Sequence, residues 1–341
     1  MYGTMNEKID FVVLWVDGSD PEWQKERSLY CPQSQNNGSS DNRYRDWDLM
    51  RFWFRGTEQF APWVNRIFFV TNGQIPFWLN VEHPKLRLVN HREYIPEKYL
   101  PTFNSNVIEL WLHKIPDLSE QFVLFNDDMF LTAPVTPSDF FKDGVPRESA
   151  LMDIATAPGP EDCLPHMQIN NFSLLNRHFD KREVLKKNFA KFFTVRYGGD
   201  LLRNFLLAPF QYFSCFRDSH LPSSYLKSTF TKVWEKEGEL LENCGTNKFR
   251  SKQDYTHWLM KCWQICEGNF AVRRTGWGHH YELWEDDIKK ICRSIERQTY
   301  PVICLNDSKA DIAFEDMKKM LKESFTHILP DLSEFEQTDY M

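Results

Sequence analysis

Alternating apolar and polar segments in the first part of the chain predict an α/β domain. Short β-prone runs that end in polar residues predict buried strands at Ile9–Val16, Arg66–Thr71, Leu86–Val89 and Gln121–Phe125. Between them, apolar residues at helical spacing predict helices over residues 45–60 and 103–115. The order strand, helix, strand, strand, helix, strand is typical of a Rossmann-like α/β fold with a mostly parallel sheet.

The pattern changes near Lys181. Amphipathic stretches rich in Lys and Glu over Lys181–Phe193 and Ser223–Glu242 predict a largely helical C-terminal part. A strand-like run at Pro301–Asp307 could then add a last strand to the first sheet. We therefore expect three parts, namely an α/β core over residues 1–180, a mainly helical region over 181–300, and a return strand with a C-terminal helix completing the core over 301–341.

Composition and charge narrow the class of protein. The chain has 341 residues, of which 42% are hydrophobic, enough for an ordinary buried core. Its net charge of −7 argues against a basic surface that follows a nucleic-acid backbone, so we expect no nucleic-acid partner. No apolar run is long enough to span a bilayer, and the beginning of the chain resembles a strand more than a signal peptide. These features favour a cytoplasmic protein.

The eight cysteines form no CxxC pair. A chain of this size does not depend on disulfides to fold, so reduced thiols in the cytoplasm fit best. Cys262 and Cys266 stand one helical turn apart beside two tryptophans, where buried packing is favoured over zinc binding.

Two acidic segments follow predicted strands. Asp127 and Asp128 come after the strand that ends at Phe125, and the Asp17–Asp20 loop follows the first strand. Ligands bind beyond the carboxyl ends of parallel strands, so both segments should face a ligand. Their hard oxygen atoms suit Mg²⁺ or Mn²⁺ on a diphosphate. Ordinary turns and helix caps are the alternative for both, and Gly18 would permit unusual backbone angles in the loop.

Three further positions could contribute chemistry because of their residue type. His220 could take a proton from a hydroxyl group near neutral pH, and the His279–His280 pair is its rival. Arg250 could hold phosphate oxygens, with a solvated helix start as the alternative. The Asn306–Asp307 pair could line the same site or cap a strand.

Four blocks, in this order, resemble the Stealth family of sugar-phosphate transferases, which serve bacterial capsules and include the phosphotransferase that tags eukaryotic lysosomal enzymes. They are IDFVVLWVDGSDP from Ile9; residues 45–135 with FAPWVNRIFFVTNGQIPFWLN and YLPTFNSNVIE; SHLPSSYLKSTFTKVWE from Ser219 with FRSKQDYTHWL after it; and VICLND from Val302. The second block is long and highly specific. Leu14, Asn72 and Asn106 stand where the family often has Thr, Asp and His, which bears on substrate detail rather than on reaction class.

The resemblance implies a glycosyltransferase-A-like core that binds a nucleotide-sugar, and a helical region that contributes catalytic and acceptor-binding residues. It also implies roles for nine residues. The implied catalytic residues are His220 as general base, Arg250 on the donor phosphate, and Asp20. The implied donor-binding residues are Asp17, Gly18, Arg51 and Asn306. The implied ligands of Mg²⁺ or Mn²⁺ are Asp127 and Asp128.

The reaction implied by the resemblance moves a hexose-1-phosphate or N-acetylhexosamine-1-phosphate from a UDP-sugar to a sugar hydroxyl. It would form a phosphodiester in a capsular or cell-surface polysaccharide and release UMP. The acceptor would be an oligo- or polysaccharide, which could be lipid-linked, so we expect a cytoplasmic enzyme at the inner face of the plasma membrane with peripheral membrane contact. The alternatives are a metal-dependent glycosyltransferase that releases UDP and a non-catalytic carbohydrate-binding subunit of a capsule assembly complex.

Overall fold

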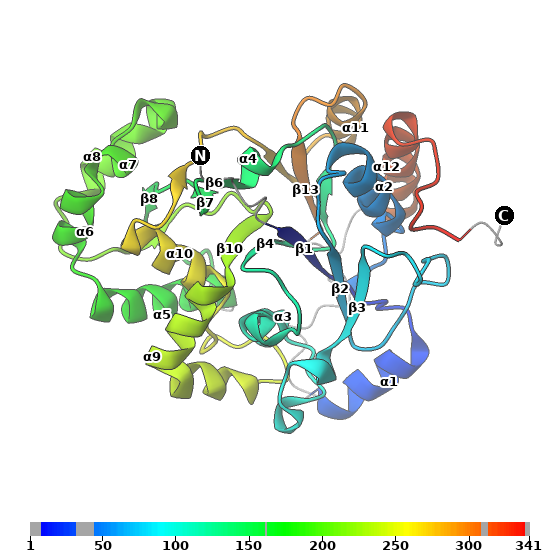
Figure 1. The fold of residues 1–341 in the computed structure, drawn as a ribbon, viewed down its shortest axis with the longest axis horizontal. Helices are drawn as coiled ribbons and strands as arrows, with labels where there is room; N and C mark the ends of the chain where they lie inside the picture. Colours follow the sequence, from blue (N-terminus) through cyan, green and yellow to red (C-terminus); the bar gives the residue numbers. More distant parts are fainter. Residues whose placement is uncertain (1–7, 32–43, 161, 308–312, 338–341) are drawn as a thin grey trace, which may run out of the picture.

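A five-stranded sheet forms the centre of the computed structural model, which describes residues 8–31, 44–160, 162–307 and 313–337 (Figure 1). The strand order is β10-β4-β1-β2-β3, with bounds Ser223–Leu226, Gln121–Phe125, Ile9–Leu14, Ile67–Thr71 and Leu86–Asn90. β4, β1, β2 and β3 are parallel, and β10 pairs antiparallel with β4 at one edge. The predicted Rossmann-like, glycosyltransferase-A-like α/β class with a mostly parallel sheet is confirmed.

The central strands send alternate side chains into two separate hydrophobic cores. In β1, Phe11 and Val13 belong to one core and Val12 belongs to the other. In β4, Val123 belongs to the first of these cores and Phe122 belongs to the second. A strand that is covered on both faces requires an almost continuous apolar sequence, which explains why these strands appear as unbroken apolar runs.

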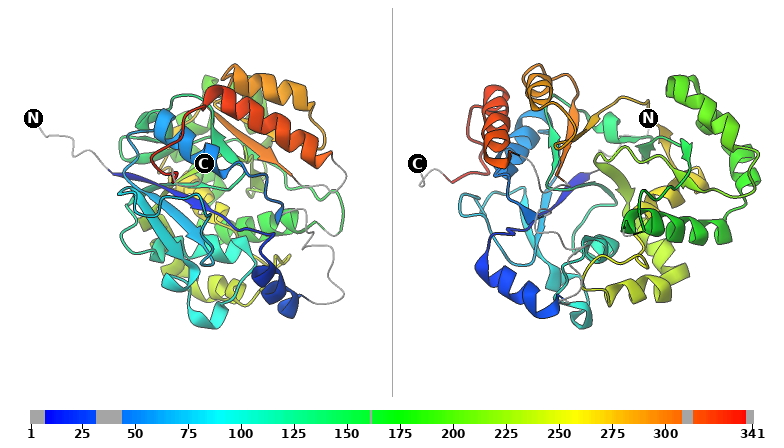
Figure 2. Two further views of the ribbon diagram at one scale, coloured as in Figure 1. Left: turned by 90° about the vertical axis from the view of Figure 1, so that its right-hand side faces the viewer. Right: turned by 180° about the vertical axis from the view of Figure 1, so that it is seen from behind.

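One face of the sheet is covered by α2 (Met50–Phe60), α11 (Ile288–Glu296), α12 (Phe314–Ile328) and a second sheet (Figure 2). The second sheet has the order β12-β13-β5, with bounds His279–Glu282, Val302–Asn306 and Met129–Leu131. The predicted return strand is therefore present as β13. Its expected place in the first sheet was wrong, because the turn after β4 leads into β5 and gives β13 a different strand edge to pair with.

The other face is covered by α3 (Ser105–Leu110), α5 (Cys163–His178), α9 (Lys227–Gly245) and α10 (Trp258–Glu267). The helix predicted from Ser223 begins only at Lys227. The four residues before it are all buried and form β10, because β4 offers them an open hydrogen-bonding edge. The helix predicted over residues 103–115 is likewise shorter, since α3 is followed by a separate 3₁₀ turn at Leu112–Lys114.

A helical lobe stands beside the sheet, at the left of Figure 1. It contains α6 (Lys181–Lys187), α7 (Phe189–Phe192), the 3₁₀ helix Val195–Asp200 and α8 (Leu201–Leu207). The single helix predicted over residues 181–193 is interrupted at Asn188, whose side-chain amide donates to the Val184 carbonyl. The remaining elements are α1 (Pro21–Tyr30), α4 (Pro137–Phe140), β6 (Phe141–Lys142), β7 (Val145–Glu148), β8 (Met152–Asp153), β9 (Cys215–Phe216), β11 (Ala271–Val272) and the 3₁₀ helices His91–Glu93 and Glu97–Tyr99.

All eight cysteines lie in the described part of the chain, and Cys262 and Cys266 pack in the core as predicted. Among the described residues, no helix combines the length and the apolar character needed to cross a membrane. The division of the chain at residues 180 and 300 stays a prediction. Residues 308–312 and 338–341 of its third part lie outside the described residues.

Candidate active site

Both acidic segments leave the same edge of the central sheet. β1 and β4 are parallel neighbours, with Val13 opposite Phe125, so the Asp17–Asp20 loop and the Asp127–Asp128 pair start side by side. Asp46 joins them from the segment before α2, because its charge acts on Asp127 and the charge of Asp17 acts on Asp46. The expected position of the two predicted segments is confirmed, while the roles of their residues stay predictions.

Asp127 and Asp128 are adjacent carboxylates that repel each other. Asp127 is reached by solvent, yet the surrounding protein reduces the hydration of its carboxylate. This desolvation, together with repulsion from Asp128 and Asp46, raises the pKa of Asp127 to about 7. Oδ1 of Asp128 is buried and has no hydrogen-bond partner among the described residues. A repelled carboxylate beside a carboxylate with one buried oxygen that lacks a partner fits a hard divalent cation.

His220 is oriented by a buried ion pair. Its Nδ1 lies 3.6 Å from Oδ2 of Asp218, and Nζ of Lys261 donates to Oδ1 of the same carboxylate at 2.9 Å. Lys261 comes from α10 and lies 3.5 Å from Glu148 as well. Burial opposes both charges, but the attraction between them is larger, so the pKa of Lys261 is raised and that of Asp218 is lowered. Asp218 thus stays ionised and holds Nδ1, which leaves Nε2 of His220 available.

The surroundings of His220 favour its protonated form. Burial alone would lower the pKa of the imidazole, but the close contact with the Asp218 carboxylate and the charge of Asp128 outweigh it and raise the pKa. The backbone of His220 is left-handed, with φ 49°, which is uncommon for a residue other than glycine. Such backbone conformations cluster at functional sites, where the surrounding structure enforces them.

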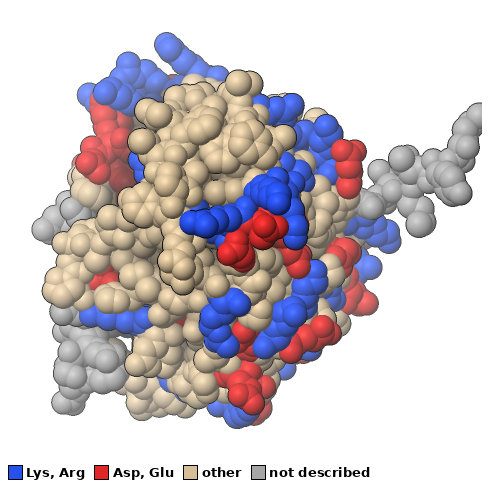
Figure 3. All heavy atoms as spheres, turned by 90° about the vertical axis from the view of Figure 1, so that its left-hand side faces the viewer, with Lys and Arg blue, Asp and Glu red and all other residues tan. Residues whose placement is uncertain are grey.

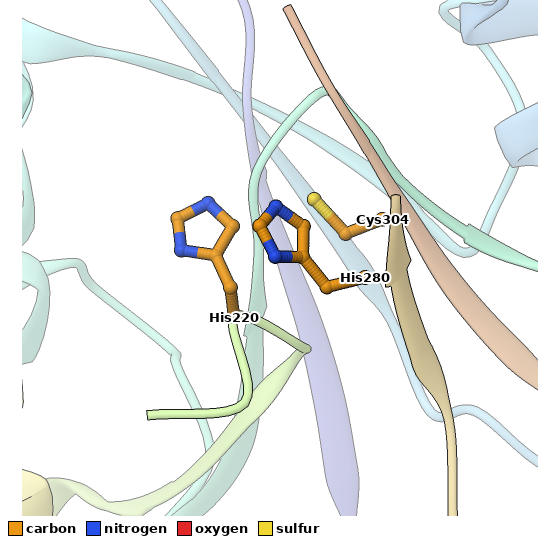
Figure 4. Close-up of side chains that lie close together, drawn as sticks. All are labelled: His220, His280 and Cys304. Atoms are coloured by element: carbon orange, nitrogen blue, oxygen red, sulfur yellow. The ribbon is translucent and has the colours of Figure 1, made fainter. Parts of the chain in front are cut away.

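A second imidazole and a thiol lie beside His220 (Figure 4). The His220 and His280 rings are 4.9 Å apart, and ligand atoms of His220, His280 and Cys304 all lie within 4.8 Å of one another. His280 and Cys304 are opposite each other on β12 and β13. Burial and then the charge of Asp128 raise the pKa of the Cys304 thiol well above its ordinary value. Two imidazoles and a thiol are softer donors than Mg²⁺ prefers, so Mg²⁺ fits the nearby carboxylates better.

Arg250 brings a positive charge to the acidic pair. Its guanidinium is exposed and donates from Nη2 to Oγ of Ser105 at 2.8 Å. Its charge acts on Asp127 and on Glu109, a buried residue of α3. Burial raises the pKa of Glu109 to about 7 although Arg250 opposes that shift, and His257 lies 3.7 Å from it. The structure therefore brings together Arg250, the acidic pair and His220, whose charge also acts on Glu109.

The Asp17–Asp20 loop is fastened by Gln74, which follows β2. The Gln74 side chain accepts from the Asp17 N–H at 2.9 Å and donates to Oδ2 of Asp20 at 2.8 Å. Oδ1 of Asp20 caps α1, and these bonds, the one from Gln74 first, lower the pKa of Asp20. A Cβ atom on Gly18 would lie 2.1 Å from the Tyr44 carbonyl oxygen. Gly18 is therefore required by a close backbone approach; the expectation of unusual backbone angles was wrong, because its φ is not positive.

Arg51 and Asn306 make contacts of their own. Nη1 of Arg51 lies 3.5 Å from Oε2 of Glu336, an ion pair that holds the C-terminal segment against α2. Nδ2 of Asn306 donates to Oε2 of Glu282 at 2.8 Å, and Asp307 accepts a bond from the indole of Trp47. The structure gives both predicted donor-binding residues protein partners, and their contact with a donor stays a prediction.

Sequence reasoning missed several residues of this region, among them Asp218, Lys261, Glu109 and Gln74. Lys261 and Glu109 carried a signal, because each is a charged residue at a position that helical spacing makes buried. A buried charge is costly without a partner, so such a position predicts an ion pair. Asp218 and Gln74 lie in loops, where no periodic pattern marks them.

The chain is similar to known proteins over nearly its whole length. Two family models match, Stealth protein CR1, conserved region 1, over residues 7–34 and Stealth protein CR2, conserved region 2, over residues 43–148. The capsular polysaccharide phosphotransferase WcwK of Streptococcus pneumoniae is 40% identical over 97% of this chain and 98% of its own. The exopolysaccharide phosphotransferase cps2G of Lactiplantibacillus plantarum is 40% identical over 96% of each chain. The receptor polysaccharide phosphotransferase WefC of Streptococcus gordonii is 40% identical over 97% of this chain and 100% of its own. Such identity over nearly the whole length means that the chain belongs to the Stealth family.

Proposed function

We propose that this protein transfers a hexose-1-phosphate or N-acetylhexosamine-1-phosphate from a UDP-sugar to a sugar hydroxyl of a capsular or cell-surface polysaccharide, with release of UMP. As a Stealth family member that is 40% identical to polysaccharide phosphotransferases over nearly its whole length, it is a sugar-phosphate transferase. Beyond that activity, we propose the UDP donor, the kind of sugar, the UMP coproduct and action in the cytoplasm.

The observation that carries the proposal is the position of an oriented imidazole beside an acidic pair. His220 is held through Nδ1 by Asp218, and its charge interacts with that of Asp128. A general base must have a free nitrogen directed at the hydroxyl that it deprotonates, and here Nε2 is that nitrogen. Arg250 lies near enough to Asp127 to influence it, so a phosphate group between them would meet positive charge.

The acidic pair fits a divalent cation such as Mg²⁺ or Mn²⁺. Asp127 and Asp128 would hold the ion, because one is repelled by its neighbours and the other has an unpaired buried oxygen. A divalent ion there would offset negative charge on the diphosphate of the donor. The Asp17–Asp20 loop starts beside this pair, and we assign it to the nucleotide-sugar, with Gly18 and Gln74 fixing its shape.

In the proposed step, the acceptor hydroxyl attacks the phosphorus nearer the sugar. Nε2 of His220 takes the hydroxyl proton while the new oxygen–phosphorus bond forms. The bond from that phosphorus to the bridging oxygen breaks, and UMP leaves with this oxygen. The bond at the anomeric carbon stays intact, so the sugar keeps its phosphate. Arg250 stabilises negative charge on the phosphate oxygens as the step proceeds.

Two other functions fit the site and the relatives less well. An ordinary glycosyltransferase uses a similar scaffold and acidic site, so the fold alone does not decide between them, but the relatives are named phosphotransferases. A non-catalytic carbohydrate-binding subunit would have no need for the buried Lys261–Asp218 pair behind His220. Maintaining two buried charges is costly, and orienting a base is a reason to keep them.

The proposal is tested by ³¹P NMR of the product formed from Mg²⁺, a UDP-hexose panel and a short saccharide acceptor. A phosphodiester signal coupled to protons of both sugars is the expected result. A new glycosidic bond with no phosphorus between the sugars would contradict the proposal. Arg250→Ala should lose the signal, whereas Arg92→Ala, which removes an exposed arginine after β3, should keep it.

A further inference from the structure

Helix α8 presents its apolar side to solvent. Leu202, Phe205 and Leu206 have the spacing of one helix face and are 63%, 52% and 64% exposed. The buried residue of α8 is Asn204, whose side-chain amide donates to the carbonyls of Ala150 and Phe192 at 2.9 and 2.7 Å. The helix is therefore anchored through a polar residue and shows hydrophobic side chains to water, the reverse of an ordinary surface helix.

Neighbouring segments extend this surface. Phe193 links α7 with α8, because its ring lies 4.8 Å from the rings of both Phe189 and Phe205. We define the apolar face of the lobe as seven exposed residues: Phe189, Val195, Leu202, Phe205, Leu206, Phe210 and Tyr212. A group of large exposed hydrophobic side chains of this kind marks a site of interaction.

The charge around the apolar face is positive although the chain as a whole is acidic. Residues 181–212 contain seven Lys and Arg against two Asp and Glu, while the net charge of the chain is −7. The exposed basic residues of the lobe are Arg182, Lys186, Lys187 and Arg196. Figure 3 looks onto this side of the molecule and shows a broad area of uncharged atoms with Lys and Arg side chains, and some Asp and Glu side chains, around it.

We propose that the apolar face of the lobe docks the protein onto the surface of an anionic lipid bilayer. Hydrophobic side chains of an interfacial surface enter the boundary between headgroups and acyl chains, while basic residues beside them meet the lipid phosphates. Local positive charge on an otherwise acidic protein favours a negatively charged partner such as an anionic bilayer. Binding to an uncharged protein surface would not require these basic residues. The docking does not depend on the proposed chemistry, but it would place the enzyme where lipid-linked acceptors reside.

The test is co-sedimentation of the full chain with vesicles of phosphatidylcholine, with and without phosphatidylglycerol. The protein should bind the anionic vesicles and bind pure phosphatidylcholine at least about tenfold more weakly. Leu202→Ser/Phe205→Ser/Leu206→Ser and Lys186→Ala/Lys187→Ala should each weaken binding at least about tenfold. Circular dichroism and thermal melting establish that these variants are folded.

Matched controls come from elsewhere on the surface. Leu29→Ser removes a side chain that is 78% exposed on α1, and Lys289→Ala/Lys290→Ala removes two adjacent exposed lysines on α11. Both should bind as the wild type does. Absence of binding to anionic vesicles would overturn the proposal. If the wild type instead self-associates and the triple serine variant does not, the apolar face of the lobe binds a second copy of the chain and not a bilayer. Transfer to a short water-soluble acceptor should be unchanged in all these variants, and its failure in the wild type would contradict the proposed chemistry alone.

Discussion

The carboxylate of Asp218 lies 3.6 Å from Nδ1 of His220 and is held on its other side by Lys261. This relationship decides which nitrogen of His220 is left for chemistry. It also joins two segments that are distant in sequence, the loop before β10 and the buried side of α10.

Replacing His220 tests the assignment of the general base. His220→Ala should lower kcat by about 100- to 10,000-fold, because the acceptor hydroxyl would have no positioned proton acceptor. His279→Ala is the matched control, since His279 stacks on Tyr300 and should leave the rate nearly unchanged. A His220→Ala enzyme with wild-type kcat would show that another group accepts the proton.

Asp218→Asn tests the positioning of His220 through the pH dependence of the reaction. His220 must be neutral to accept a proton, so kcat/KM should rise with pH through the pKa of His220, which its neighbours raise. Removing the Asp218 charge removes much of that effect, so the rise should move to lower pH while kcat falls. Asp200→Asn, which alters the partner of Arg217, should leave the profile in place. A pH profile that does not move in Asp218→Asn would show that Asp218 does not control the protonation of His220.

Asp127→Asn and Asp128→Asn test the metal assignment. Each should lower the Mg²⁺-dependent rate by about 100-fold or more, because charge on the diphosphate would be left unbalanced. Adding Mg²⁺ should raise the Tm of the wild type and have less effect on either variant. Asp331→Asn, an exposed carboxylate after α12, serves as the control. An equal Mg²⁺ response in all four proteins would place the ion elsewhere.

Gly18→Ala tests the shape of the first acidic loop. The added methyl group would overlap the Tyr44 carbonyl oxygen, so we expect a loss of about 1–3 kcal/mol in the free energy of unfolding and a higher KM for the donor. Gly159→Ala adds the same atom where no other atom lies within 4 Å and should change neither quantity. Urea unfolding and donor titrations measure both. A neutral Gly18→Ala would mean that the loop shifts at no cost.

The central sheet could be predicted from sequence because its strands are buried on both faces. β2 and β4 consist entirely of buried residues, so the apolar runs marked them within a residue or two. β10 could not be predicted in this way, since Ser223 and Ser224 are buried by pairing with β4 and not by their own hydrophobicity. Long-range pairing of this kind also determines the position of β13, which pairs with β5.

The site was only partly predictable for the same reason. The acidic pair follows a buried strand, and the position of such loops is fixed by the sheet. Lys261 reaches Asp218 across 43 residues of sequence, and Gln74 reaches Asp20 across 54, distances that no local pattern reports. The family resemblance supplied roles for single residues, whereas the groups that orient them became visible only in three dimensions.

The nucleotide coproduct distinguishes the transfer of a phosphorylated sugar from the transfer of a sugar alone. The protein is incubated with Mg²⁺, UDP-hexoses and a polysaccharide acceptor, and the nucleotides are separated by anion-exchange chromatography. UMP formed in a one-to-one ratio with product, and lost in His220→Ala, is the predicted result. UDP formed in its place would rule out sugar-phosphate transfer and assign the protein to transfer at the anomeric carbon.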